Sequence, residues 1–447
     1  MRSNDELTSA PLSWKAATEP AASAAALALN TADLRALALE AGADDVAFVE
    51  VGRPELAGER AHIENAAPWT RTLVSFVCRM NHEPIRSPAR SLANLEFHHT
   101  GDHVNEVARR MVQTLQDRGI RALNPSMGFP MEMQNFPGRI WVVSHKEVAV
   151  AAGLGRMGIH RNVIHPKFGN FILLGTVLID AEVSEHGAAI DTNPCLECKL
   201  CVAACPVGAI GADGTFNFGS CYTHNYREFM GGFTDWVETV ADSRSGVEYR
   251  SRVSDDESAS MWQSLGFGPN YKAAYCMAVC PAGEDVIGPY RTDKPGFLRD
   301  VVKPLQDKEE KVYVVPDSDA AAHVAKRFPH KTPREVSSGL RPWSITGMLA
   351  SLDLLFSRTN ARDLHAVYHF TFTGSENVEA TIGIDAGTLR IEYGHVGTPD
   401  LRVRADADTW LAFVRKERGI AGAILTGKIR MRGNPKLLAA FGRCFPS

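Results

Sequence analysis

Seven of the nine cysteines are confined to one part of the chain, and their spacing suits iron–sulfur clusters. The first four precede Pro206 in the rhythm Cys-x2-Cys-x2-Cys-x3-Cys-Pro: Cys195, Cys198, Cys201 and Cys205. In bacterial ferredoxins three closely spaced thiolates hold one cluster, and the fourth thiolate binds the other cluster. Zinc sites also use Cys-x2-Cys pairs, but four cysteines in this rhythm before a proline favour iron. The sequence therefore predicts two cubane-type clusters.

A second cysteine motif ends the same segment but is incomplete. It contains Cys276 and then Cys280 before a proline, and Ala273 stands where a further cysteine is expected. The two-cluster pattern assigns one set of four and one set of three: Cys195, Cys198, Cys201 and Cys280 for a [4Fe-4S] cluster, and Cys205, Cys221 and Cys276 for the second. The second cluster is thus a [3Fe-4S] cluster, a [4Fe-4S] cluster with an open iron, or a cluster with a fourth ligand of another type. His224 is the nearest candidate for that ligand, although hydrogen bonding is the simpler role for a histidine.

The remaining bulk properties set the expected surroundings. Cys78 and Cys444 stand alone, so a disulfide framework does not explain the cysteines, and a reducing, cytoplasmic location is expected. No apolar run reaches the roughly 18 residues of a membrane-spanning helix, and the first residues do not read as a secretion signal. The formal net charge of −4 and the pI near 6.4 predict no nucleic-acid partner.

Glycines and polar residues are concentrated just before the cysteines, in AVAAGLGRMGIHRNVIHPKFGNFILLGTVLID. Gly153, Gly155 and Gly158 superficially match a dinucleotide-binding loop, but a helix-like run precedes them where that loop requires a strand, so NAD binding is not expected. Glycines at such positions serve turns or the close approach of another group. Four polar side chains are candidates for a reacting centre: His145, Lys146, His160 and Arg161.

The elements that must position these residues divide the 447-residue chain into several modules. The predicted boundaries are a flexible leader at 1–29, a catalytic α/β or α+β domain at 30–190, a cluster domain at 191–290, a connector at 291–342 and a small α+β domain at 343–447. In the catalytic domain a helix from Thr31, a turn at Gly42 and then a strand are expected from capping and periodicity.

The glycine-rich segment, the cysteine motifs and VCRMN at 77–81 together resemble the core shared by epoxyqueuosine reductase and the reductive dehalogenases. The resemblance covers about residues 30–290. It implies an α+β multidomain protein in which a nitroreductase-like α/β domain binds cobalamin beside a bacterial ferredoxin-like domain with two clusters. The residues implied to lie against the corrin are Gly153, Leu154, Gly155, Gly158, Gly169 and Gly175.

The C-terminal hundred residues, from HAVYHFTFTG to TGKIRMRGN, resemble the sterol carrier protein 2 (SCP2) family. That resemblance implies a curved sheet packed with helices around an apolar tunnel. The apolar residues expected on the inner sheet face are Val367, Phe370, Phe372, Ile382, Ile384, Leu389 and Ile391.

The leading functional prediction is a cobalamin-dependent iron–sulfur reductase acting on a hydrophobic or lipid-like small molecule, by reductive dehalogenation or a related cleavage. Its electrons are expected from an external ferredoxin, flavodoxin or reductase. The acidic proton donor of epoxyqueuosine reductase has no match in IWVVSHKEV, so tRNA reduction is not expected. The alternative is a non-catalytic electron carrier with a lipid-binding module. A pure lipid-transfer protein leaves the cysteines unexplained.

Overall fold

The computed structural model describes residues 28–128 and 142–446, and the chain forms two compact units. The first unit contains the chain up to Arg79, Gly101–Gly155 and Leu173–Asp191; the second contains Met80–Thr100, Arg156–Ile172 and the chain from Thr192 onward. The predicted leader at 1–29 lies almost entirely outside the described residues. Within those residues, no helix has the length and apolar character needed to cross a membrane.

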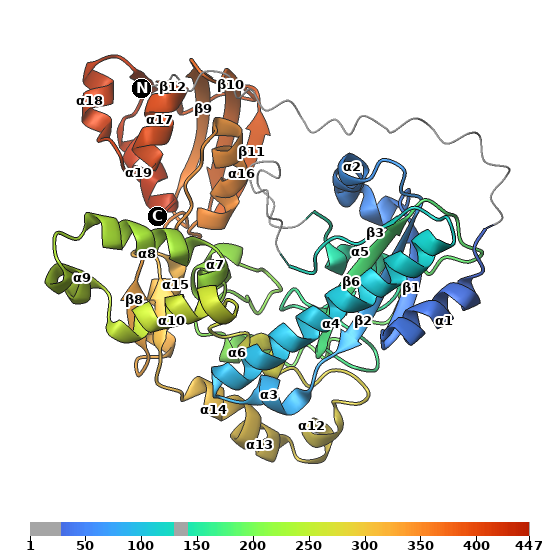
Figure 1. Ribbon diagram of the computed structural model, residues 1–447. Helices are drawn as coiled ribbons and strands as arrows, with labels where there is room; N and C mark the ends of the chain where they lie inside the picture. Colours follow the sequence, from blue (N-terminus) through green and yellow to red (C-terminus); the bar gives the residue numbers. More distant parts are fainter. Residues whose placement is uncertain (1–27, 129–141, 447) are drawn as a thin grey trace. The chain divides into compact units, whose positions relative to one another are not determined.

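The first unit is built on a four-stranded sheet in the order β1-β2-β6-β3 (Figure 1). Its strands are β1 Asp45–Glu50, β2 Thr72–Arg79, β6 Ile172–Ile179 and β3 Ala122–Leu123, and its helices are α1 Thr31–Ala41, α2 Ala57–Ala66, α5 His145–Ala152 and most of α4 Arg90–Asp117. The predicted opening helix, turn and strand are confirmed. Asn30 caps α1 by accepting the N–H of Ala32 at 2.8 Å, and Gly42 ends it with φ +116°.

Both faces of this sheet are covered, which explains the unbroken apolar run of β2. Val74, Phe76 and Cys78 pack with α1 and α4, whereas Leu73 packs on the opposite face with residues of α2 and α5. Alternate side chains of a strand point to opposite faces, so a strand buried on both sides must be apolar throughout.

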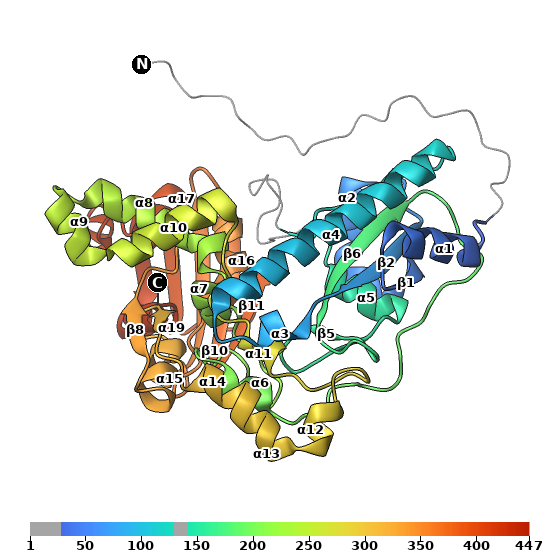
Figure 2. The same ribbon diagram turned by 60° about the horizontal axis from the view of Figure 1, so that its bottom comes forward.

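The second unit contains the seven clustered cysteines, and its part before the C-terminal domain is mostly helical. Its elements before the C-terminal domain are α3 His82–Arg86, β4 Arg156–Met157, β5 Val163–Ile164, α6 Leu200–Ala204, α7 Phe218–His224, α8 Gly231–Asp242, α9 Gly246–Arg252, α10 Asp255–Phe267, α11 Tyr275–Ala278, α12 Gly288–Thr292, α13 Lys294–Phe297, α14 Lys303–Gln306, β7 Lys311–Val314, α15 Asp319–Arg327 and β8 Thr332–Glu335. The polar stretch in the middle of the cysteine segment is helical, and α8, α9 and α10 lie together in both views (Figures 1 and 2). Ser254 and Glu257 form a capping box at the start of α10.

The C-terminal part of the second unit is a five-stranded sheet in the order β11-β10-β9-β12-β13, with one parallel pair, β9 and β12. Its elements are α16 Ile345–Leu355, β9 His365–Thr373, β10 Val378–Asp385, β11 Thr388–Tyr393, β12 Leu401–Asp406, α17 Ala407–Val414, α18 Ile420–Leu425, β13 Ile429–Gly433 and α19 Lys436–Cys444. The inner sheet face packs with α16, α17 and α19 around Trp410 and Phe441 (Figure 1).

Six of the seven residues predicted for the inner sheet face belong to this core. Val367 does not: it lies one residue out of phase, between the buried Ala366 and Tyr368, and shares the outer face with Thr371. The prediction was wrong for Val367 because it placed an odd-numbered position of β9 together with even-numbered ones, and strand side chains alternate with a period of two.

Candidate iron–sulfur site

Two short helices of the second unit, α6 and α11, carry Cys201 and Cys276, and the residue before each helix has the same backbone conformation. Lys199 (φ +61°) precedes α6 and Ala274 (φ +53°) precedes α11 in the left-handed conformation. Each helix then presents a cysteine at its second residue, Cys201 or Cys276, and another four residues later. The two helices pack against each other. This repeated geometry brings thiols from distant parts of the chain together, as the two cysteine motifs predicted.

The first predicted set of thiols converges. Cys195 packs against a small buried cluster formed by Cys280, Ile164 and Ala282. Burial, together with the neighbouring thiols Cys198, Cys195 and Cys276, raises the pKa of Cys280 to about 12, although the N–H of Ala282 opposes the shift. Burial and the charges of Cys276, Cys280 and Cys198 also raise the pKa of Cys201. Thiols crowded in this way become stable thiolates when they coordinate a metal.

The second predicted set is held by backbone donors and by α7. The Cys205 sulfur is buried and accepts the N–H of Ala209 at 3.3 Å. The N–H groups of the three other residues from 207 to 210 also act to lower the pKa of Cys205, although burial raises it more. Such N–H donors to cluster sulfurs are a usual means of tuning potentials. Cys221 lies on α7, and both Cys221 and Cys276 act on the neighbouring phenol of Tyr226, whose pKa burial raises strongly.

Ala273 occupies the position where the second motif lacks a cysteine, and its backbone is held by Asn225. Ala273 is 4% exposed, and its N–H donates to Asn225 Oδ1 at 3.0 Å. Asn225 also accepts the N–H of Lys272 through its carbonyl oxygen, at 3.2 Å. Asn225, at the end of α7, therefore holds residues 272–273 just before Cys276. Cys221 lies on the same helix, one turn before Asn225.

The hydrogen bonding of His224 does not suit it as the fourth ligand of the second cluster. Its Nδ1 accepts the N–H of Tyr313 at 3.3 Å, so the ring proton is on Nε2, which cannot donate a lone pair to iron. Burial lowers the pKa of His224 to about 4, and the nearby Glu310 opposes that shift. These contacts favour the hydrogen-bonding role for His224.

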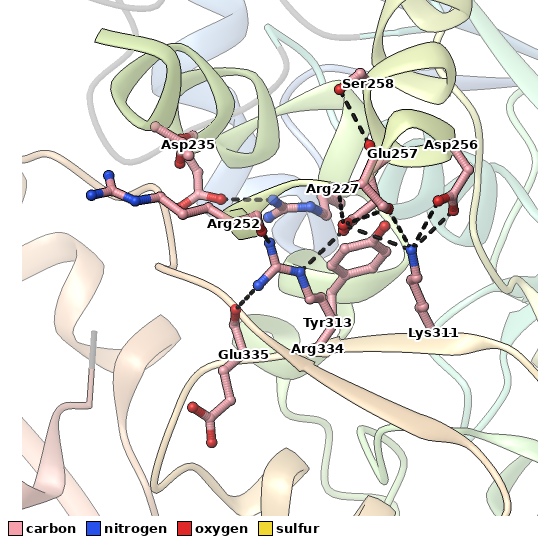
Figure 3. Close-up of polar contacts among 12 residues, drawn as sticks. Arg227, Asp235, Arg252, Asp256, Glu257, Ser258, Lys311, Tyr313, Arg334 and Glu335 are labelled. Atoms are coloured by element: carbon pink, nitrogen blue, oxygen red, sulfur yellow. Dashed lines mark hydrogen bonds and ion pairs between the residues drawn. The ribbon is translucent and has the colours of Figure 1, made fainter. Parts of the chain in front are cut away.

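A polar network beside His224 anchors the β7–β8 pair (Figure 3). Lys311 Nζ lies 2.9 Å from Asp256 Oδ2, and Arg334 Nε donates to Glu257 Oε1 at 3.2 Å. The Arg227 guanidinium lies 4.6 Å from the centre of the Tyr313 ring and donates to Asp235. Because Tyr313 follows Lys311 on β7, this network positions the N–H that the His224 ring accepts.

Two arginines close to the thiols were missed by the sequence reasoning: Arg86 on α3, which is half-buried, and Arg90 at the start of α4, which is buried. Within the described residues the Nε and Nη2 atoms of both are buried without a hydrogen-bond partner, whereas Arg90 Nη1 donates to the carbonyls of Ile85 and Ser87. Burial lowers the pKa of each guanidinium; Glu83 and then Cys280 oppose this at Arg86, and Tyr275, Glu310 and Cys276 oppose it at Arg90. The thiolates of a bound cluster would add to the negative charge beside these cations.

A buried ion pair supports the residue before Cys276. Lys331 Nζ, on a side chain 1% exposed, lies 2.8 Å from Glu310 Oε1, and Glu310 Oε2 accepts the Tyr275 hydroxyl at 2.6 Å. We expect Lys331→Met to lower the free energy of unfolding by about 3 kcal/mol, because it leaves the Glu310 charge buried with fewer partners. Thermal unfolding should show this, whereas Arg60→Met, which breaks the exposed 2.7 Å pair with Glu64, should cost less than about 0.5 kcal/mol. Equal losses would contradict the prediction.

The donor set consists of thiols, which a cluster spreads over several irons. Cys198, Cys195 and Cys276 all act on the pKa of Cys280, so these thiols lie near one another. All nine cysteines are free thiols. The site is therefore suited to iron–sulfur ligation.

The four polar residues predicted for the reacting centre are divided between the two units: His145 and Lys146 belong to the first, His160 and Arg161 to the second. The buried His145 ring has both nitrogens engaged, Nδ1 with Thr176 Oγ1 at 2.8 Å and Nε2 with the Ser126 carbonyl at 3.0 Å. Burial lowers the pKa of His145, and the hydrogen bond with the Ser126 carbonyl opposes that shift.

His160 is also fixed by its neighbours. Its Nδ1 accepts the N–H of Asn162 at 3.2 Å, and its Nε2 lies 3.3 Å from the Asn170 amide. Arg161 adopts φ +62° in the turn that follows. These contacts assign the two histidines to holding the backbone in place, and the catalytic role remains a prediction.

At three of the glycines predicted to lie against a corrin, other parts of the chain occupy the space beside the glycine. A Cβ at Gly153 would meet the Ala188 carbonyl oxygen at 2.3 Å, and one at Gly169 would meet the Ala282 carbonyl oxygen at 1.9 Å. At Gly175 it would meet the Phe76 ring at 2.2 Å. Close packing within the chain is sufficient to explain glycine at these three positions, and the binding of a corrin stays a prediction.

The cysteine spacing and the two packed helices that carry Cys201 and Cys276 are compatible with iron–sulfur ligation. Comparison with known families agrees: residues 188–211 match the 4Fe-4S binding domain, and residues 353–446 match the SCP-2 sterol transfer family. These matches confirm an iron–sulfur region and an SCP2-like C-terminal domain in one chain.

Comparison with individual proteins confirms the resemblance to epoxyqueuosine reductase. The enzyme of Staphylococcus aureus is 35% identical over 80 residues, 18% of this chain, and the chain spans only 20% of that relative's length. Among solved structures, epoxyqueuosine reductase with an epoxyqueuosine-modified tRNA stem loop has a TM-score of 0.32 at 15% identity, covering 44% of this chain and 60% of that one. A catabolic reductive dehalogenase has a TM-score of 0.37 at 16% identity, covering 65% and 35%.

The predicted partners are contradicted by these relatives. The named relatives are epoxyqueuosine reductases, and this finding contradicts the prediction of a hydrophobic small-molecule substrate and no nucleic acid. The substrate prediction relied on the C-terminal module, and the prediction of no nucleic acid relied on the net charge of the whole chain. Net charge averages over every surface and does not report a local basic patch.

Proposed function

We propose that this protein is an iron–sulfur reductase that delivers electrons, one at a time, to a substrate carried on RNA. The observation that carries the proposal is the packing of Cys195 against Cys280, which lie far apart in the sequence, with Arg86 and Arg90 close enough for their charges to interact with the thiols. The similarity to epoxyqueuosine reductases supports the reaction class and the RNA-borne substrate.

The proposed ligands follow the geometry of the two motifs. Cys195, Cys198, Cys201 and Cys280 hold a [4Fe-4S] cluster; Cys205, Cys221 and Cys276 hold the second cluster, which lacks a thiolate at Ala273. When bound, the clusters supply single-electron transfer. Arg86 and Arg90 offset the negative charge of the thiolates, and the N–H groups around Cys205 stabilise its sulfur.

The proposed substrate is an epoxide on a modified nucleoside. Opening an epoxide to an alkene and water consumes two electrons and two protons, and an external one-electron donor of the ferredoxin or flavodoxin class supplies the electrons. Cobalamin remains a separate prediction of the family resemblance. No step proposed for this chain depends on it, and cobalt analysis of the purified protein tests it.

The test uses anaerobically purified, chemically reduced full-length protein and an RNA stem loop bearing the epoxide nucleoside. Nucleosides released by digestion are analysed by mass spectrometry, and the expected product has lost one oxygen atom. Cys280→Ser protein, reduced in the same way, should give no product. If the wild-type clusters are reduced and no product forms, the chain is an electron carrier and the proposal fails.

We expect Arg90→Gln to shift the potential of the cluster beside Cys276 to more negative values. The guanidinium favours the extra electron of the reduced cluster, and its buried position limits screening by water. A redox titration followed by electron paramagnetic resonance measures the shift. Arg90→Lys keeps the charge and should bring the potential part of the way back to the wild-type value. The exposed Arg299→Gln should leave the potential unchanged.

A further inference from the structure

Four arginines gather on the outer face of the C-terminal sheet, on the neighbouring strands β12 and β13. Arg402 pairs directly with Arg432, and Arg404 pairs with Arg430, so all four side chains leave the same face, and all four are exposed. Residues two apart on a strand are about 6.8 Å apart, and directly opposite residues about 5 Å apart. We call these four residues the arginine quartet.

The arginine quartet has no acidic partner. Within the described residues, none of the four forms an ion pair; Arg430 only donates to the Gly427 carbonyl at 3.2 Å. Other exposed arginines of this protein are matched with a carboxylate, as Arg60 is with Glu64, whereas in the quartet each arginine lies directly opposite another. Like charges directly opposite each other on a sheet are destabilising. The quartet therefore works against the stability of the sheet unless an anion binds it.

Protection of the sheet edge does not explain the quartet. Charged residues on an edge strand prevent pairing with other chains, and β13 is an edge strand. However, Arg402 and Arg404 lie on β12, which is covered on both sides by β9 and β13. Their neighbours across β9 on the same face are Thr371, which is half-buried, and His369, which is buried and stacks with the exposed His395 ring at 4.5 Å. The surface beside the quartet is therefore polar.

We infer that the arginine quartet binds the phosphate groups of the RNA that carries the substrate. Arginine binds phosphate through a rigid pair of donors, and closely spaced guanidinium groups suit successive phosphates of a polyanion. Polar neighbours favour nucleic acid over a membrane, since membrane-bound helices and sheets bury apolar side chains beside their cations. The choice of RNA rests on the proposed function; the anionic character of the ligand rests on the quartet alone.

Binding of a fluorescently labelled, unmodified RNA stem loop to the full-length oxidised protein tests this inference by fluorescence anisotropy. Arg402→Gln/Arg432→Gln should weaken binding roughly tenfold or more at low salt. It should also reduce the slope of log affinity against log salt by about 2. The control, Arg299→Gln/Arg390→Gln, makes the same change in net charge at exposed arginines that have carboxylate partners, and it should bind as the wild type does.

Three results would overturn the inference. The first is an equal loss of affinity in both double variants, and the second is wild-type affinity in Arg402→Gln/Arg432→Gln. The third is quartet-dependent binding to phosphatidylserine vesicles without RNA binding, which would favour a membrane partner. These measurements need neither reductant nor an epoxide. Product formation from the epoxide-bearing RNA therefore reports on the proposed function separately, and each can fail alone.

Discussion

Cys280→Ser protein is expected to retain roughly half of the iron and acid-labile sulfide of the wild type and to lose reductase activity. Cys280 is the ligand that closes the first cluster from a distant part of the chain, and it packs directly against Cys195. Without it, three closely spaced thiolates remain, and the cluster loses its fourth attachment. Iron and sulfide analysis, together with electron paramagnetic resonance of the reduced protein, measures the loss.

The chain offers two matched controls for this experiment. Cys78 and Cys444 are fully buried but belong to the hydrophobic cores of the first unit and the C-terminal domain. Replacing either with alanine should leave the iron content unchanged, with a cost in stability of about 1 kcal/mol for the small cavity. Full iron in Cys280→Ser, or the same loss in Cys78→Ala, would disprove the ligand assignment.

Gly169→Ala is expected to destabilise the second unit by more than about 3 kcal/mol and to reduce cluster retention. Its φ of +64° disfavours a side chain, and a Cβ there would lie 1.9 Å from the carbonyl oxygen of Ala282, two residues after Cys280. The backbone must therefore move beside a cluster ligand. Thermal unfolding of the anaerobic protein and its iron content measure both effects.

Gly214→Ala separates the clash from backbone strain. Gly214 has a similar left-handed conformation, φ +86°, but a Cβ there has no heavy atom within 4 Å. It should cost only about 1 kcal/mol and leave the iron in place. If the two variants behave alike, strain rather than the contact with Ala282 accounts for the effect, and the proposed coupling to Cys280 is refuted.

Local patterns predicted several elements of the first unit well. The capped helix ending at Gly42, the buried strand β2 and the helix before Gly153 all follow from periodicity and capping within a few residues. Val367 shows the limit of this reasoning, since a single-residue error in strand phase moves a side chain to the opposite face.

The glycine-rich segment shows a second limit. The family resemblance implied that its glycines contact a large planar ligand, and at Gly153, Gly169 and Gly175 carbonyl oxygens and the Phe76 ring of the same chain already approach closely. A glycine in a sequence records only that something approaches closely. Which group approaches depends on contacts between residues far apart in the chain.

The sequence alone determined the chemistry at the centre of this protein, because the spacing of Cys195, Cys198, Cys201 and Cys205 is a local property that only a few metal groups satisfy. Tertiary structure alone decided what surrounds that chemistry. It brought Arg86 and Arg90 beside the thiols and aligned RVR at 402–404 with RMR at 430–432 into one basic face. In the sequence these arginines are scattered among acidic residues and cancel in the net charge, and only strand pairing places them together.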